Sequence, residues 1–383
     1  MACNQQDSHG QQDGNNGTQA SFPGTGILHA GPFLVVSDAP ERVAHAANQV
    51  LYKASIPLTQ ERTFRVYLWH ENRTAATRTF RIRIRLASGT AKLRDIRHYA
   101  EISTADYLIV GRNLSCVYRY GNFNAAALPD EVGTGFAQIW TANVLDGRLV
   151  ACVAEFTVET PSAPTTLVVQ TCCDNGMPPG DVNPVPPVNQ YRPDENPPRL
   201  PHTHIRGWWP YSEVTFPVNQ ILSADPESLG PPIECGVVEL TQPDGPTPPE
   251  LEASAFGHRG DGEDPFGTPS GNKGLYGAVV KYVFIAHNAN VNHPSLLGLA
   301  IQMRNNGGRF SGVGGTIVPQ GSGLLIPTLH ANGNPKISSF STGTGLGMII
   351  EPKEWKIVEC ELCTAGACTL PVNLVFSASG INP

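Results

Sequence analysis

Nine cysteines are the residues with the widest potential chemistry in this chain of 383 residues. Because the number is odd, at least one thiol must be free, bridged to another chain or bound to a metal. Cys3 and the adjacent pair Cys172 and Cys173 are predicted to form intermolecular disulfides, since neighbouring cysteines close on each other only with strain. The remaining cluster supplies candidates for intrachain disulfides, with zinc as the less favoured alternative: Cys360, Cys363, Cys368 and Cys235.

Two other groups have side chains that metals use as ligands. His202 and His204 would project to one side of an extended chain, but two histidines without a third ligand are an incomplete site. Asp261, Glu263 and Asp264 crowd a glycine-rich segment and are weak calcium candidates. Solvated charge is the favoured interpretation of this acidic segment. The sequence therefore predicts no metal and no cofactor.

The most prominent surface feature is a row of alternating basic and aromatic residues. Stacked guanidinium and aromatic groups can bind an anionic sugar or pack against protein. We interpret the row as a contact face, either between two domains or between subunits. Its members are Arg65, Tyr67, Trp69, Arg81, Arg83 and Arg85.

The segments that carry this row, residues 62–72 and 78–86, alternate apolar and polar side chains with the period of a β-strand. They are predicted to form one antiparallel hairpin with a dry face and a basic face. The apolar pattern returns without a gap at an offset of 217 (287 − 70), which aligns His70 with His287. Both histidines are predicted to cap their hairpins through a hydrogen bond to the backbone.

A second repeat, Ser37 with Ser223, has an offset of 186 (223 − 37). Short runs of β-branched and aromatic residues, bounded by Gly, Pro, Asn or Asp, fill both halves. The prediction is an all-β chain of two duplicated, jelly-roll-like β-sandwich domains joined by a Pro-rich linker. The boundaries are a flexible arm at 1–24, domain 1 at 25–173, the linker or strap at 174–212, and domain 2 at 213–383 with an inserted loop at 241–274.

Composition narrows the classes of partner. A net charge of −7 gives no electrostatic reason to expect nucleic acid. No run approaches the roughly 18 apolar residues of a membrane-spanning helix. The first residues lack a basic start and an apolar centre, so no signal peptide is predicted. Scattered cysteines in a Pro/Gly-rich chain with 15% charged residues favour an oxidising final location, outside the cell or at a cell or spore surface.

The segments LVVSDAPERV, VLYKASI and FRVYLWHEN resemble the start of a group of uncharacterised bacterial surface proteins with S-x-x-P-E and H-x-N motifs. The tail, from GLYGAVVKYVF to CTAGACTLPVNLVFSA, is similar to the closing half of the same proteins. The resemblance implies two related β-sandwich domains and no assigned activity. This chain departs from the pattern in its extra cysteines and its missing export signal.

No catalytic motif is present, since there is no G-x-S-x-G, H-E-x-x-H or P-loop sequence. The leading hypothesis is therefore a non-enzymatic structural protein of a surface, fibre or coat, self-associating into a homo-oligomer or polymer and linked in part through cysteines. A double-jelly-roll viral capsid protein is one alternative. A carbohydrate-binding module or glycan-acting enzyme, using the face of Tyr67 and Trp69 or the Asp261 loop, is the other.

Overall fold

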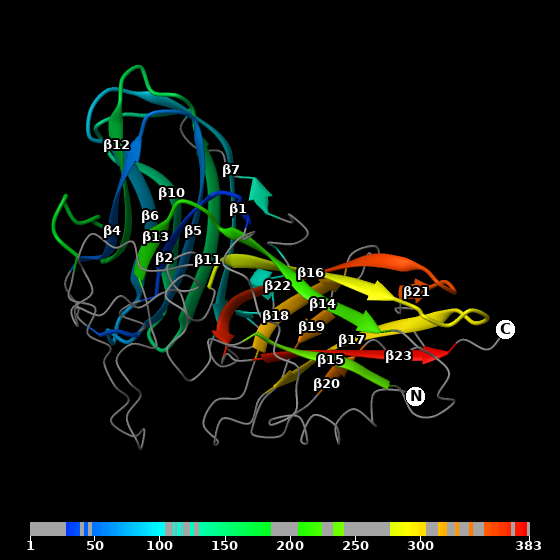
Figure 1. Ribbon diagram of the computed structural model, residues 1–383. Coiled ribbons are helices and arrows are strands. Elements are labelled where there is room, and N and C mark those ends of the chain that lie inside the picture. Colours follow the sequence, from blue (N-terminus) through cyan, green and yellow to red (C-terminus); the bar gives the residue numbers. More distant parts are fainter. Residues whose placement is uncertain are drawn as a thin grey trace.

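The structure is a computed structural model whose described residues are almost entirely β-strand, which confirms the predicted all-β class. It describes residues 28–38, 42–44, 48–103, 110–111, 113–115, 117, 123–125, 130–184, 206–223, 233–240, 276–303, 313–319, 326–328, 337–339, 348–368 and 372–380. Figure 1 shows the strands packed into two units, one coloured blue to green and the other green to red. Over these residues, no helix has both the length and the apolar character needed to cross a membrane.

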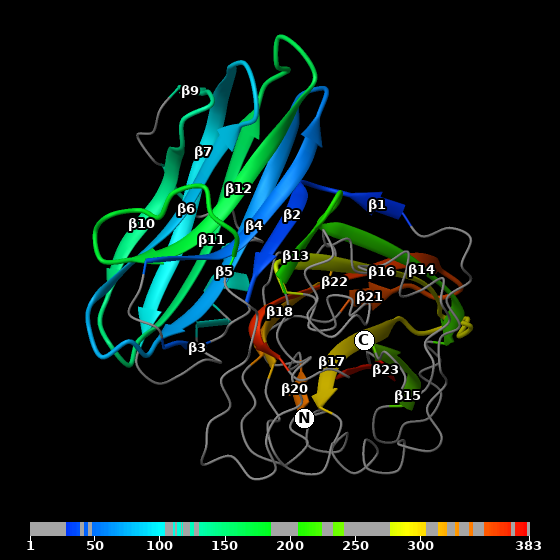
Figure 2. The ribbon, with the colours of Figure 1, turned by 90° about the vertical axis from the view of Figure 1, so that its left-hand side faces the viewer.

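The first sandwich packs a large sheet of order β13-β2-β5-β11-β7-β8 against a small sheet of order β10-β6-β12-β4 (Figure 2). Phe64 and Phe156 from the large sheet and Phe80 and Ile82 from the small sheet are fully buried between them. The strands are β2 (Phe33–Ser37), β3 (Arg42–Val43), β4 (Gln49–Leu58), β5 (Arg62–Asn72), β6 (Arg78–Leu86), β7 (Ala91–Ser103), β8 (Asn124–Ala125), β9 (Glu131–Val132), β10 (Ala137–Val144), β11 (Leu149–Val158), β12 (Thr165–Asp174) and β13 (Arg206–Trp209).

The second sandwich has a large sheet of order β1-β14-β16-β22-β18-β19 and a small sheet of order β20-β17-β23-β15, with β21 also paired to β17. The strands are β1 (Leu28–Ala30), β14 (Glu213–Ser223), β15 (Ile233–Leu240), β16 (Ala278–His287), β17 (Ser295–Met303), β18 (Val313–Pro319), β19 (Ile326–Thr328), β20 (Ile337–Ser339), β21 (Met348–Ile350), β22 (Trp355–Cys368) and β23 (Val372–Gly380).

The two halves have the same strand order in both sheets. In each large sheet the second and third strands pair in parallel, β2 with β5 and β14 with β16, and the other neighbours are antiparallel. The small sheets share a local irregularity as well. The pairing of β4 with β12 skips Leu51, and that of β15 with β23 skips Cys235, so a bulge occurs at the same place in both.

The predicted hairpins of residues 62–86 and of their counterparts in the second half are wrong. β5 lies in a large sheet and β6 in a small one, and β16 and β17 are separated in the same way. Strict alternation tells which side chains are buried together, but a hairpin and two strands facing each other across a core satisfy it equally. The apolar side chains of β5 and β6 therefore meet across the sandwich.

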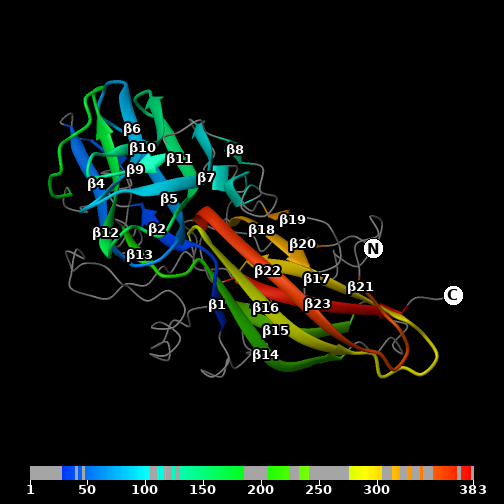
Figure 3. The same cartoon turned by 90° about the horizontal axis from the view of Figure 1, so that it is seen from above.

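The first strand of each half pairs with the other half. β1 adds to the edge of β14, and β13 adds to the edge of β2, both antiparallel. Figure 3 shows the dark blue β1 among the strands of the second sandwich. Residues 206–209, predicted to belong to the linker, are thus part of the first sandwich.

The turn that closes each large sheet is built in the same way around a buried asparagine. Asn72 Nδ2 donates to Val144 O at 2.8 Å, and its Oδ1 accepts from the Thr74 amide at 3.1 Å. Asn288 Nδ2 donates to Ile350 O at 3.0 Å, and its Oδ1 accepts from the Asn290 amide at 3.1 Å. We call these two residues the asparagine clamps.

The clamps fix the alignment of the third strands, because Asn72 and Asn288 differ by 216 (288 − 72), not by 217. A shift of one residue moves every side chain to the other face of a strand. Ala286 is fully buried and its neighbour Ile285 is 44% exposed, so the apolar residues predicted to face the core of β16 face outwards. The predicted equivalence of His70 and His287 is wrong for the same reason.

One local prediction of strand is also wrong. The β-branched and aromatic runs at residues 105–112 and 114–120 predict two further strands of domain 1, whereas the described residues 110–111 and 113–115 are helical. The Ser115 hydroxyl donates to Gly111 O at 2.8 Å, one helical turn earlier. Short apolar runs fit a buried strand and a buried helical turn equally well, and their periodicity does not separate the two.

Candidate functional site

The aromatic part of the predicted contact face lies on β5 and is covered by the second half. Tyr67 and Trp69 are 1% and 4% exposed. The ring of Tyr67 stacks on Tyr276, with centroids 6.0 Å apart and planes within 5°. Tyr67 therefore buries surface between the two halves, and Trp69, itself buried, offers no open platform for a sugar ring.

A charged cluster lies on the same face of the large sheet. Arg65 Nε donates to Glu155 Oε1 at 2.6 Å, and Arg97 Nε donates to Glu155 Oε2 at 2.9 Å. Arg65 Nη1 also donates to Gly277 O in the second half at 3.3 Å. Glu155 is almost completely buried, so both of its oxygens need these partners to offset the cost of removing them from water.

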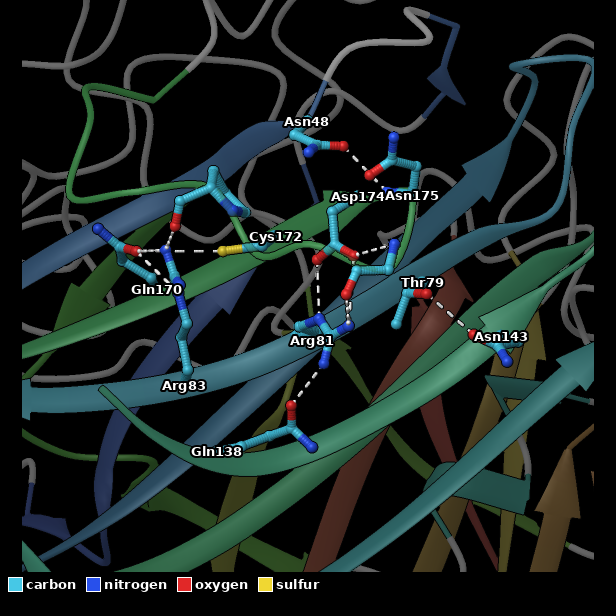
Figure 4. A network of polar contacts seen from close by, with 12 residues as sticks. Asn48, Thr79, Arg81, Arg83, Gln138, Asn143, Gln170, Cys172, Asp174 and Asn175 are labelled. Carbon is cyan, nitrogen blue, oxygen red and sulfur yellow. Dashed lines mark hydrogen bonds and ion pairs between the residues drawn. The ribbon is translucent and has the colours of Figure 1, made fainter. Parts of the chain in front are cut away.

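The three arginines of β6 lie on the small sheet, so the predicted single contact face is divided between two sheets. Figure 4 shows how Arg81 is held: its Nε donates to Asp174 Oδ2 at 2.7 Å, and its Nη1 to Gln138 Oε1 at 2.6 Å. The side chain of Asp174 is fully buried. Arg81 is thus already neutralised and oriented by its own chain.

Residues 175–184, the first part of the predicted linker, cover the other two arginines. From here on, the strap means these ten residues. Arg83 donates to Gln170 Oε1 at 2.8 Å and to the backbone oxygens of Pro179 and Gly180, and its guanidinium lies 4.0 Å from the ring centroid of Phe136. Arg85 pairs with Asp181. The basic row is therefore occupied by the protein's own carbonyl and carboxylate groups.

Asp181 is the charged anchor of the strap. Lys53 Nζ lies 2.8 Å from its Oδ1, and Gln170 Nε2 donates to the same oxygen at 3.0 Å. The hydrogen bond from Lys53, together with that from Arg85, lowers the pKa of Asp181 below its usual value. The carboxylate therefore stays ionised and holds the strap at neutral pH.

A buried serine and histidine lie within hydrogen-bond distance inside the first sandwich. Ser37 Oγ is 2.9 Å from His70 Nε2 and 2.7 Å from Thr171 Oγ1. All three residues are fully buried, so the pair has the spacing of a nucleophile and its base but no path for a substrate. Because Thr171 lies in the small sheet, the cluster ties the two sheets together. His70 thus bonds a side chain of the neighbouring strand β2.

The adjacent cysteines do not fit the predicted link to another chain. Cys172 and Cys173 lie on β12, between β4 and β6, and both are fully buried as thiols. Burial raises the pKa of Cys172 to about 11 and that of Cys173 to about 12. Cys152 is a third buried thiol, and burial raises its pKa as well. Buried, protonated thiols are poor nucleophiles, so these residues behave as core side chains.

The predicted cluster of Cys360, Cys363 and Cys368 lies along one continuous strand, β22. Residues three apart in a strand are separated by roughly 10 Å, which exceeds the reach of a disulfide. The strand geometry therefore argues against a bridge between Cys360 and Cys363. Cys363 is buried, and Cys235 is the bulge residue of β15 in the other sheet.

Several predicted site residues lie outside the described residues: Cys3, His202, His204, Asp261, Glu263 and Asp264. Among the residues that are described, no group of three or more His, Cys, Asp or Glu side chains is arranged to hold a metal ion. The candidate surfaces that can be built from contacts are thus the outer faces of the sheets.

One outer face stands open. On β16 and β22, Ile285 pairs with Ile357 and His287 pairs with Trp355 across the strands. Ile285, Ile357 and Trp355 are 44%, 61% and 57% exposed, and the ring of His287 stacks on Trp355 with centroids 3.9 Å apart. We call these four residues the apolar ladder.

The charged groups beside the apolar ladder are paired with one another. Lys281 Nζ lies 2.7 Å from Glu359 Oε2 and 3.7 Å from Glu361 Oε1. The hydrogen bond with Glu359 raises the pKa of Lys281. This end of the face therefore presents one lysine between two glutamates, a paired cluster with an excess of one negative charge.

The sequence contained a signal for this open face that the gapless alignment missed. In β22, Trp355 and Ile357 share their phase with Glu359 and Glu361, and in β16 Lys281 shares the phase of Ile285. Charged side chains on a strand indicate the solvent side. Their position marks the apolar ladder as an outward face.

Comparisons with known proteins give no family. The chain matches no protein-family model and no curated protein. Among solved structures it is similar to the N-terminal CBM22-1-CBM22-2 tandem domain of Xyn10C from Paenibacillus barcinonensis, with 10% identity over 93% of this chain and 92% of that chain. The TM-score of that match is 0.18, so nothing about function follows from it.

Proposed function

We propose that this chain is a non-catalytic structural protein that associates with further copies of itself through the apolar ladder of its second half. The observation that carries the proposal is the exposure of Ile285, Trp355 and Ile357 side by side on one sheet face. Soluble monomers rarely leave contiguous large apolar side chains open, and such patches mark sites of contact.

The chemistry of the face favours a protein partner of the same kind. Two of the exposed side chains are aliphatic, and the neighbouring charges are satisfied within the chain. The partner therefore has to supply mainly apolar surface. A second copy meets this requirement. A two-fold axis through the pair of Ile285 and Ile357 brings the apolar ladder of one copy against the apolar ladder of the other.

The architecture is consistent with a building block. The two halves share strand order, clamps and bulge positions, and we infer that they are copies of one sandwich. We further propose that the protein works at a cell or spore surface or in a coat. Because the thiols of Cys172 and Cys173 are buried, we expect the contacts between copies to be apolar and not disulfide bonds through these two residues.

Sedimentation velocity over a range of concentrations tests the proposal. The chain is expected to form dimers or larger species, and Trp355→Ser combined with Ile357→Ser is expected to weaken association at least about ten-fold. The matched control is Leu145→Ser, which removes an equally exposed apolar side chain, 57%, from the first half. A monomer at every concentration, or an equal effect of the control, would contradict the proposal.

A second candidate is binding of a neutral glycan. It is favoured by the exposed indole of Trp355, since aromatic rings are common platforms for sugars. Binding to a glycan array that disappears in Trp355→Ser but persists in Ile357→Ser would support this candidate over self-association, because a sugar needs the ring more than the aliphatic neighbour.

A further inference from the structure

The reciprocal pairing of β1 and β13 makes each half incomplete without the other. β13 supplies Trp208, which packs against the core of the first half, and Arg206 Nη1 donates to Leu51 O at 2.6 Å in the small sheet. Trp208 stacks on Phe33 with centroids 6.2 Å apart. A strand that fills a core in this way is a structural component of the first sandwich, although the chain enters the second sandwich directly after it.

The return crossing is equally tight. The Ser212 amide donates to Ala30 O at 3.1 Å where β1 meets β14. Gly31 has a φ of +79°, and a Cβ there would lie 2.7 Å from Glu213 Cγ and 2.8 Å from Ser212 Oγ. The two crossings thus contact each other, and only glycine fits at residue 31.

Short links tie each crossing strand to its own half. Two residues, Gly31 and Pro32, separate β1 from β2, and three residues, 210–212, separate β13 from β14. β1 cannot leave β14 unless the whole first half moves with it, and the same holds for β13 and the second half. Between the described parts of the two halves, residues 185–205 are the covalent connection, and 21 residues span at most about 70 Å.

We propose that copies of this chain exchange halves, so that β1 of one copy pairs with β14 of another and β13 of the second pairs with β2 of the first. The exchanged contacts are identical to those within one chain, so exchange costs little beyond the concentration of partners. Mutual exchange gives a closed dimer, and one-way exchange continues into a chain of copies. This uses a different surface from the apolar ladder and does not depend on it.

An engineered disulfide between β1 and β14 shows directly whether the two paired strands belong to the same chain or to different chains. Ala30 and Glu213 are register partners, and Cα atoms of antiparallel partners lie about 4.5–5.5 Å apart, which suits a disulfide. The protein carrying Ala30→Cys and Glu213→Cys is unfolded, refolded at increasing concentration, oxidised, and separated under denaturing, non-reducing conditions. The fraction of covalent dimers and larger species is expected to rise about ten-fold for each ten-fold rise in concentration while it is small.

The control is Thr63→Cys with Thr157→Cys, a pair on β5 and β11 whose hydroxyl oxygens are 3.0 Å apart within the first half. This pair is expected to close only within single chains. Both pairs are placed in the background of Trp355→Ser, so that association through the apolar ladder does not contribute to the covalent dimers. If the Ala30 and Glu213 pair also closes only within single chains at every concentration, or does not close, exchange of halves is ruled out.

Discussion

The large sheets of the two halves share their strand order but differ in what their outer faces do. In the first half, Tyr67 stacks on Tyr276 of the second half, Trp69 is buried as well, and β5 is buried on both faces. In the second half, the corresponding face of β16 and β22 carries Ile285 and Trp355 in the open. The same plan therefore yields one face that is used within the chain and one that is available to a partner.

The difference does not arise from the phase of the strands, since Trp69 and Ile285 each stand three residues before their clamp, on the face away from the core. The clamp determines where the third strand ends, and the phase of alternation counted from it determines which side chains face the core. Backbone topology and the phase of the strands are thus shared, and the side chains on the outer faces differ. Variants at the clamps, the crossings and the turns test the shared backbone plan separately from the side chains of the outer faces.

The largest expected effect comes from removing a clamp. Asn72→Ala and Asn288→Ala each leave buried backbone groups without partners, and each should lower the free energy of unfolding by about 3 kcal/mol. Urea denaturation measures the effect. Asn143→Ala is the control, because its single bond from Thr79 is exposed and its loss should cost less than about 1 kcal/mol. Equal losses in all three variants would show that the clamps have no special role.

The crossing of the halves is the next most sensitive place. Gly31→Ala adds a clash to a left-handed residue and should cost roughly 2–3 kcal/mol, whereas Gly147→Ala meets no atom within 4 Å and should cost only about 1 kcal/mol of backbone strain. Thermal unfolding of both variants gives the comparison. If Gly31→Ala is no worse than Gly147→Ala, the crossings are not as close as described.

The closing turns allow a prediction with opposite signs. Gly147 has a φ of 74°, and the equivalent Lys353 has a φ of 62°; their amides donate to Asn72 O and Asn290 O in the adjacent clamp segments. Lysine is strained there, so Lys353→Gly should stabilise the protein by about 0.5–1 kcal/mol and Gly147→Lys should destabilise it by about as much. A loss of stability in Lys353→Gly would refute the equivalence of the turns.

The strap should have the smallest effect. Asp181 is partly exposed and has a lowered pKa in the folded state, so its contribution is present above the unfolded value of 3.8 and is lost as the pH falls through the folded value. Asp181→Asn should therefore lower stability by less than about 1 kcal/mol at pH 7 and remove that part of the acid dependence. Paired denaturation curves at pH 7 and pH 3 test this, and an unchanged pH dependence would argue against the anchor.

Much of the fold could be predicted from the sequence, because alternation and turn residues specify strands locally. The all-β class, the apolar sides of β5 and β6, and the repeated order of elements follow from such patterns. Which strands pair could not be predicted, since alternation is silent about partners. Residues 28–30 were assigned to domain 1 and residues 206–209 to the linker, whereas β1 pairs with the second half and β13 with the first.

The candidate surface was harder to predict because it depends on one residue of phase. A gapless alignment on His70 and His287 placed Ile285 inside, and only the clamp at Asn288 shows that the alignment is displaced. The arginines of β6 looked like an open basic face for a related reason. Their partners, Asp174 and Asp181, come from a distant part of the chain.

The most direct test of self-association through the apolar ladder is oxidative footprinting of tryptophans as a function of protein concentration. Trp69 and Trp209 are buried within the chain and should stay unmodified throughout. Trp355 should be oxidised in dilute protein and become protected as the concentration rises. Oxidation of Trp355 to the same extent at every concentration would contradict the account.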